Sequence, residues 1–148
     1  FWNFSWNATK ILKNEQQVVE GGAVQTRLDK YYEPSSLRQR GAVSWYDKGW
    51  MANLFVNYTG SYSNDLPITI NGVVQPVEKI GAWITADLNL GYEKTLDAGW
   101  FSGFRVNMNI NNLTDKAPPV VLSGSTAYNP VKSNPWGRTW SMSLTLDF

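Results

Sequence analysis

The chain of 148 residues contains no cysteine and no histidine. Without cysteine it has neither disulfides nor thiol chemistry, and without histidine it lacks the commonest general base and metal ligand. A Ser-His-Asp triad is therefore excluded. We also find no glycine-rich phosphate loop and no carboxylate pair suited to glycoside hydrolysis. The sequence predicts a protein that is not an enzyme and that needs no metal or other cofactor.

An excess of one charge and a long apolar run are also missing. The 13 basic residues nearly balance the 12 acidic ones, for a net charge of +1, so the charge does not favour a nucleic-acid partner. No segment has the roughly 18 consecutive apolar residues of a membrane-spanning helix. Aromatic residues, in contrast, make up 14% of the chain and include 8 tryptophans. This composition suits a barrel wall, in which half of each strand is polar and faces a lumen.

The last nine residues, 140–148, alternate between apolar and polar without interruption. Side chains of a strand point to opposite faces with period two, so this segment predicts a strand with one wholly apolar face. The ends of soluble domains tend to fray and to be polar, whereas the closing strand of a membrane barrel turns such a face to lipid. The apolar positions are Trp140, Met142, Leu144, Leu146 and Phe148.

The same alternation recurs in earlier parts of the chain. It is clear in residues 2–12, 50–62, 80–92 and 104–111, and weaker in 37–45. Most of these lengths suit a tilted strand that crosses a bilayer, which takes about 9–11 residues. The sequence therefore predicts an all-β fold of about six antiparallel membrane-spanning strands.

The links between these strands alternate in length. Residues 46–49 form a tight turn that ends in glycine and residues 93–103 a modest polar link, whereas 13–36, 63–79 and 113–137 are long. Outer-membrane barrels combine short periplasmic turns with long extracellular loops. If the C-terminus is periplasmic, every long link falls outside the cell and both short ones fall inside.

Aromatic side chains gather near the predicted strand ends, as in the girdles at the two surfaces of a membrane. They would also fit the core of a soluble sandwich, but the polar faces weigh against that alternative. The predicted girdle residues are Trp2, Trp45, Trp50, Tyr58, Tyr62, Tyr92, Trp100, Phe104, Trp140 and Phe148.

Five stretches resemble, in the same order, the C-terminal part of TonB-dependent outer-membrane receptors. Asn111 to Pro119 reads NNLTDKAPP and resembles that family's NLFDKxPP segment, with Thr114 in place of the aromatic residue. Residues 128–148 resemble its closing YDP…GRxxxLxLxxxF pattern, and the resemblance extends over essentially the whole chain. The other three stretches are residues 34–45, 51–62 and 83–92.

The resemblance implies both a place in a larger protein and a function. Complete members enclose a plug domain in a barrel of about 22 strands, so residues 1–148 would be the C-terminal portion of that barrel, without the plug domain and the earlier strands. Such receptors actively import a scarce nutrient, most often a ferric siderophore, across the outer membrane of Gram-negative bacteria. The implied partners are outer-membrane lipid, the rest of the barrel and plug, the TonB system through the missing N-terminal part, and the barrel-assembly machinery. That machinery would read the alternating residues from Trp140 to Phe148 as its signal.

Two groups of residues are candidates for contact with a ligand. Arginines on the predicted polar faces would line a path that attracts an anionic ligand, or would instead pair with carboxylates such as Asp87 and Glu93. Aromatic residues in the long loops would stack on a siderophore, a sugar or a corrin, or would instead anchor their own loops. The candidates are Arg38, Arg40, Arg105 and Arg138, and Tyr31, Tyr32, Tyr128 and Trp136.

Two alternatives remain open at the level of the sequence. One is a passive porin, or a small complete barrel with at least two further strands. The other is a soluble all-β module that binds carbohydrate through its loop tyrosines and tryptophans.

Overall fold

Twelve strands and no helix make up the regular structure of residues 1–123 and 126–148, which the computed structural model describes. Six short strands lie in the long links, in three two-stranded ribbons: β2 (Glu15–Gln17) with β3 (Val24–Thr26), β6 (Tyr62–Asn64) with β9 (Glu78–Ile80), and β7 (Thr69–Ile70) with β8 (Val73–Val74). The other six form one sheet: β1 (Trp2–Lys10), β4 (Leu37–Asp47), β5 (Trp50–Thr59), β10 (Trp83–Ala98), β11 (Phe101–Asn111) and β12 (Thr139–Asp147). Nowhere in these described ranges is there a helix with the length and apolarity to cross a membrane.

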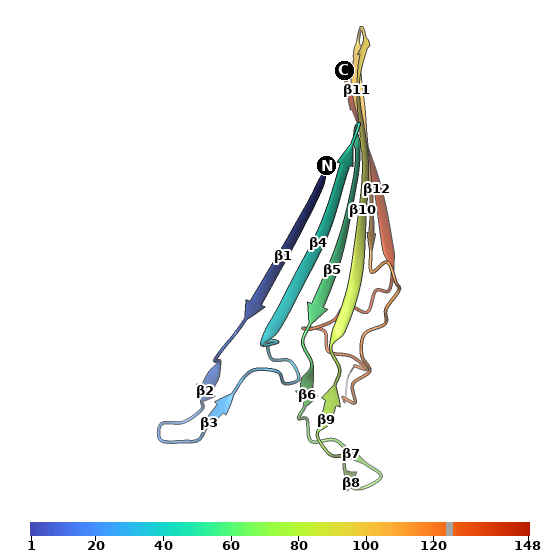
Figure 1. Ribbon diagram of the computed structural model, residues 1–148. Coiled ribbons are helices and arrows are strands. Elements are labelled where there is room, and N and C mark those ends of the chain that lie inside the picture. Colours follow the sequence, from blue (N-terminus) through green and yellow to red (C-terminus); the bar gives the residue numbers. More distant parts are fainter. Residues whose placement is uncertain (124–125) are drawn as a thin grey trace.

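The large sheet is a meander in which each strand pairs antiparallel with its neighbour in chain order. Its order is β1-β4-β5-β10-β11-β12, so the prediction of six antiparallel strands is confirmed. Within the described residues, β1 and β12 each pair on one side, which leaves two open edges. The long links gather at one end of the sheet, and both chain ends lie toward the other (Figure 1).

The register brings the apolar positions of all six strands onto one face. Phe4 lies opposite Val43, and the same row continues through one residue of every later strand. Several of these side chains are open to solvent: Phe4 is 73% and Trp140 is 72% exposed. No layer of the described structure covers this face. The row reads Phe4, Val43, Leu54, Leu88, Ile110 and Trp140.

Aromatic rings cross the apolar face near the short turns. The Trp2 and Trp45 rings lie 6.4 Å apart, the Trp50 and Tyr92 rings 4.5 Å apart, and the Tyr92 and Phe104 rings 5.9 Å apart. Five adjacent strands thus each contribute one ring to a band across this face.

The opposite face carries hydrogen-bonded polar side chains. Asn53 Nδ2 donates to Asn89 Oδ1 at 3.0 Å, and Asn89 Nδ2 donates to Asn109 Oδ1 at 2.7 Å. These residues stand opposite one another on β5, β10 and β11. Because amides both donate and accept, the row satisfies its own polar groups across three strands.

The buried apolar residues lie among the long links and not on the sheet. Tyr31, Tyr62, Ile80 and Val121 are each at most 6% exposed, and they come from all three long links. We call these four residues the loop core. The three links are therefore packed on one another.

Several strand boundaries differ from the sequence prediction. The expected link 93–103 is part of a longer hairpin, because β10 and β11 continue pairing to a turn at Gly99 and Trp100. At the other end, the segment expected from residue 80 is interrupted at Gly81 and Ala82, and the partner strand is interrupted at Gly60 and Ser61.

The interruption changes the surroundings of two predicted outward residues. Tyr62 and Ile80 pair with each other in the β6–β9 ribbon and are buried in the loop core. Placing Tyr62 in the outer girdle was therefore wrong. The alternation did not predict their burial, because Tyr62 and Ile80 fall at the even-numbered positions that are apolar in β5 and β10.

The β4–β5 hairpin has a two-residue turn with positive φ at both central positions, 47° at Lys48 and 86° at Gly49, the signs of a type I′ turn. A Cβ on Gly49 would collide with the backbone carbonyl oxygen of Glu93, and the Glu93 amide donates to Gly49 O at 2.9 Å. Glycine is thus required both for the turn and for contact with the next hairpin.

We predict that Gly49→Ala destabilises the protein more than Gly72→Ala. Gly72 also has positive φ, 78°, but a Cβ there would meet nothing within 4 Å. The Gly72 variant should lose about 1–2 kcal/mol from the conformation alone, and the Gly49 variant more, because of the collision. Denaturant unfolding of both variants measures the difference, and equal losses would contradict this reading of the contact.

Candidate functional site

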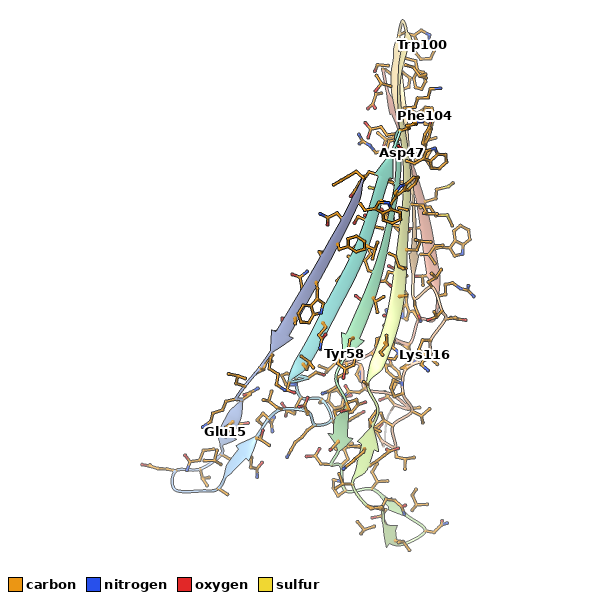
Figure 2. All side chains as sticks on the ribbon, viewed as in Figure 1. Glu15, Asp47, Tyr58, Trp100, Phe104 and Lys116 are labelled. Atoms are coloured by element: carbon orange, nitrogen blue, oxygen red, sulfur yellow. The ribbon has the colours of Figure 1, made fainter. Side chains whose placement is uncertain are left out.

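The candidate site lies where the polar face of the sheet meets the long links. Figure 2 shows Tyr58 and Lys116 at this end and Trp100 at the tip of the β10–β11 hairpin, at the opposite end. The three links are joined here by specific hydrogen bonds as well as by the loop core. Asn64 Nδ2 donates to Leu122 O at 2.6 Å, and Ser63 N donates to Asp29 O at 2.8 Å.

A buried lysine lies against the loop core. Lys132 is 6% exposed, donates from Nζ to Ser35 Oγ at 3.2 Å, and places Nζ 4.5 Å from the centre of the Tyr62 ring. Burial lowers the pKa of Lys132 to about 8, against the opposing charge of Asp29. Burial also raises the pKa of the Tyr62 hydroxyl to about 12. Both shifts follow from the cost of burying the charged form.

A pocket of about 270 Å³ opens on the polar face beside these links. Strands β5, β10, β11 and β12 form its floor, and residues of the last long link form one side. Its lining is rich in amides and indoles: Asn57, Asn111, Asn134, Trp83, Trp136 and the carboxylate of Asp87.

Asp87 is held by hydrogen bonds to both of its oxygens. Asn57 Nδ2 donates to Oδ2 at 2.7 Å, and the Asn112 amide donates to Oδ1 at 2.9 Å. This aspartate therefore fixes the start of the last long link onto the sheet. It does not pair with an arginine, as the sequence had suggested for it.

Trp83 differs from its surroundings because its indole Nε1 is buried and has no hydrogen-bond partner among the described residues. It shares the polar face with Thr85 and Asp87, since all three have the same parity on β10. Sequence reasoning missed Trp83 as a site residue. An aromatic residue at a polar-face position was the signal that could have identified it.

The four predicted arginines do not form one cluster. Arg38 donates to Val131 O at 3.3 Å, the Arg40 guanidinium lies 4.2 Å from the centre of the Phe55 ring, and Arg105 forms an ion pair with Glu93 at 3.0 Å. Arg105 lies toward the short-turn end, away from Arg38. The fourth, Arg138, is exposed, and its backbone amide donates to Asp115 Oδ1 at 2.7 Å.

The predicted loop aromatics fall into different environments. Tyr31 is buried in the loop core, where its hydroxyl lies 3.2 Å from Thr126 Oγ1. Tyr32 is 51% exposed and meets the Tyr31 ring edge-on. Tyr128 is half-buried, whereas Trp136 is 74% exposed and lines the pocket. Of the eight candidates, Trp136 is the one in the pocket lining.

The predicted assembly signal lies on and just beyond the edge strand β12. Its first four apolar residues are in the strand and are exposed, and Phe148 follows it. The Phe148 ring stacks on Trp100 of the neighbouring hairpin at 5.5 Å, with 13° between the ring planes.

No group of three or more histidine, cysteine, aspartate or glutamate side chains is placed to hold a metal ion in the part of the chain that the structure describes.

Comparison of the chain with protein-family models, curated proteins and solved structures gave no match.

We predict that packing of the loop core responds to pH in two opposite ways. Between about pH 8 and 10.5, Lys132 is neutral in the folded loops but protonated when they unfold, so stability rises with pH. Between about pH 10 and 12, Tyr62 stays protonated in the fold but ionises when released, so stability falls. Stability of the loops should therefore peak near pH 10.

Near-ultraviolet circular dichroism during denaturant unfolding, at a series of pH values, measures this profile. Lys132→Met keeps a similar length without a titrating group and should lose the rising limb while it keeps the falling one. An unchanged rise in the Lys132→Met variant would show that another group is responsible.

Proposed function

We propose that this chain forms part of the wall of an outer-membrane β-barrel that imports a nutrient actively, in the manner of the TonB-dependent receptors that its sequence resembles. Its place would be the outer membrane of a Gram-negative bacterium. One observation carries the proposal: a six-stranded sheet with a largely apolar, uncovered face on one side and a hydrogen-bonded polar face on the other.

The exposed apolar face supports contact with lipid. Each fully exposed large side chain forgoes about 1.5–3 kcal/mol of burial free energy in water, and monomeric soluble proteins rarely leave so continuous a patch uncovered. In a bilayer the same side chains face hydrocarbon. The band of rings from Trp2 to Phe104 then lies at one membrane surface, where tryptophan and tyrosine are favoured.

The two open edges support membership of a larger barrel. A lipid-exposed edge leaves backbone groups without hydrogen bonds, which is why barrels in membranes are closed. The smallest such barrels have eight strands, so a six-stranded sheet needs further strands at β1 and β12. We propose that these belong to the same receptor, together with a plug.

The soluble alternative receives no support from the packing. A carbohydrate-binding sandwich needs a second layer over its apolar face, and the buried apolar residues of the described structure lie instead among the long links. The distinction between active import and passive diffusion rests on the resemblance. The expectation of a ferric siderophore also rests on the resemblance. The mode of import and the substrate therefore both call for direct tests.

We predict that Leu144→Lys destabilises the protein in lipid by about 2–4 kcal/mol, whereas Ser143→Lys has little effect. Both residues are exposed neighbours on β12 and point to opposite faces. Refolding of the complete protein into lipid vesicles, followed by denaturant unfolding, measures the two losses. A soluble sheet would tolerate both substitutions about equally, and that outcome would refute the membrane assignment.

We predict that uptake by cells that make the complete protein stops when an uncoupler collapses the potential of the inner membrane. Active import needs that energy, whereas a passive pore would continue to equilibrate the solute. Uptake of radiolabelled ferric siderophores and of labelled oligosaccharides should be followed with and without uncoupler, in cells with and without the gene. Protein-dependent uptake that persists with uncoupler would favour the porin.

A further inference from the structure

We infer that the pocket beside Trp83 is a binding site for a neutral, polyhydroxylated ligand, an oligosaccharide, with Trp83 as hydrogen-bond donor and Trp136 as stacking surface. The inference rests on the proposed function, because it takes the polar face as the lumen. It specifies the chemical class of the imported nutrient and the residues of this chain that touch it.

The Trp83 indole provides the first argument. Its buried Nε1 has no acceptor among the described residues, and an unsatisfied buried donor costs about 1–3 kcal/mol. Trp83 lines this pocket and also a neighbouring one of about 450 Å³ that runs along residues 130–135. Because Trp83 lines both pockets, a ligand in either one lies against the residue that carries the unsatisfied donor.

The amides provide the second argument. Asn57, Asn111 and Asn134 line the pocket from two strands and the last long link. Each amide carries donors and an acceptor, the combination that sugar hydroxyls need because they also donate and accept. Asn57 is held in place by its bond to Asp87, and Asn111 Nδ2 donates to Thr139 Oγ1 at 3.3 Å, so the amides are positioned before a ligand arrives.

The charge of the lining of the pocket of about 270 Å³ disfavours an anionic ligand. The lining contains one carboxylate, Asp87, and neither lysine nor arginine. Both oxygens of Asp87 already accept hydrogen bonds. The nearby Lys132 lines the neighbouring pocket and donates from Nζ to Ser35 Oγ. An anionic ferric chelate or a phosphate would enter without a cationic partner and beside a negative charge, which costs binding energy. A neutral ligand avoids that cost.

Trp136 provides the apolar contact. Its ring is 74% exposed at the pocket, and its backbone amide donates to Asn134 Oδ1 at 2.9 Å. A rigid, flat indole supplies a large apolar surface at low entropic cost, and the C–H face of a sugar ring matches it. The pocket thus offers hydroxyl partners on its floor and a stacking surface at its side.

The test measures binding to the complete protein in detergent micelles. The probes are neutral oligosaccharides of four to seven units built from glucose, galactose, mannose, xylose or fructose, compared with ferric catecholate and ferric hydroxamate chelates. Trp83→Phe keeps an aromatic ring and removes the N–H, Trp136→Ala removes the stacking surface, and Trp100→Phe at the far hairpin is the control.

We expect at least one neutral oligosaccharide to bind, with affinity lowered about tenfold by Trp83→Phe and further by Trp136→Ala, and unchanged by Trp100→Phe. A tenfold loss corresponds to about 1.4 kcal/mol, within the range for one hydrogen bond. Because Trp136 is an exposed loop residue, its variant tests the site even if the Trp83 variant folds poorly.

Three results would overturn the inference: no oligosaccharide of the panel binds, binding is indifferent to both substitutions, or a ferric chelate binds in a manner that depends on Trp83. The last result would leave nutrient import standing and change its substrate. Failure of membrane insertion in the Leu144 and Ser143 experiment would instead remove the proposed function itself, so the two failures are distinguishable.

Discussion

The placement of the apolar face of the six-stranded sheet is the constraint on which the rest of the structure depends. Every strand contributes alternating apolar residues to it, and the antiparallel register aligns them in continuous rows such as the one from Phe4 to Trp140. No element of the described structure packs on these rows. The hydrophobic effect usually requires a second layer over such a face, and in the proposed receptor membrane lipid takes the place of that layer.

The polar face and the long links have their own stabilising contacts, separate from the apolar face. Backbone pairing holds the six strands together, and amide ladders such as Asn53–Asn89–Asn109 join β5, β10 and β11 across the polar face. The links build their own small core around Tyr62 and Ile80, supported by the buried amine of Lys132. The links lie at one end of the polar face (Figure 1), and Trp136 of the last link lines the pocket, so that the sheet supplies the floor of the site and the links supply its side.

The sequence predicted the large sheet well because alternation with period two is a local signal, clear in five of its strands and weaker in β4. A tight turn was predicted over residues 46–49 from the glycine at its end, and the structure narrows this turn to Lys48 and Gly49. The sequence did not predict that β10 begins at Trp83, or that Tyr62 and Ile80 are buried, because these depend on contacts between links that lie far apart in the chain. Trp136 was identified among the loop aromatics, whereas Trp83 was assigned to a strand and passed over. Arg38, Arg40 and Arg105 lie on the polar face as predicted, whereas Arg138 lies before β12 and is not on that face of the sheet. The separate partners of the arginines are set by tertiary structure.

The most direct test of the account is the environment of each residue along β12, since both faces of that strand are exposed in the structure. This chain has no cysteine, so single cysteines at positions 140 to 147 can be spin-labelled in the complete protein in lipid vesicles. Accessibility to oxygen and to a water-soluble nickel chelate should be measured at each position. The account predicts high oxygen and low nickel accessibility at residues 140, 142, 144 and 146, and the reverse at 141, 143, 145 and 147. Equal accessibility along the strand, with the protein folded and water-soluble, would contradict it.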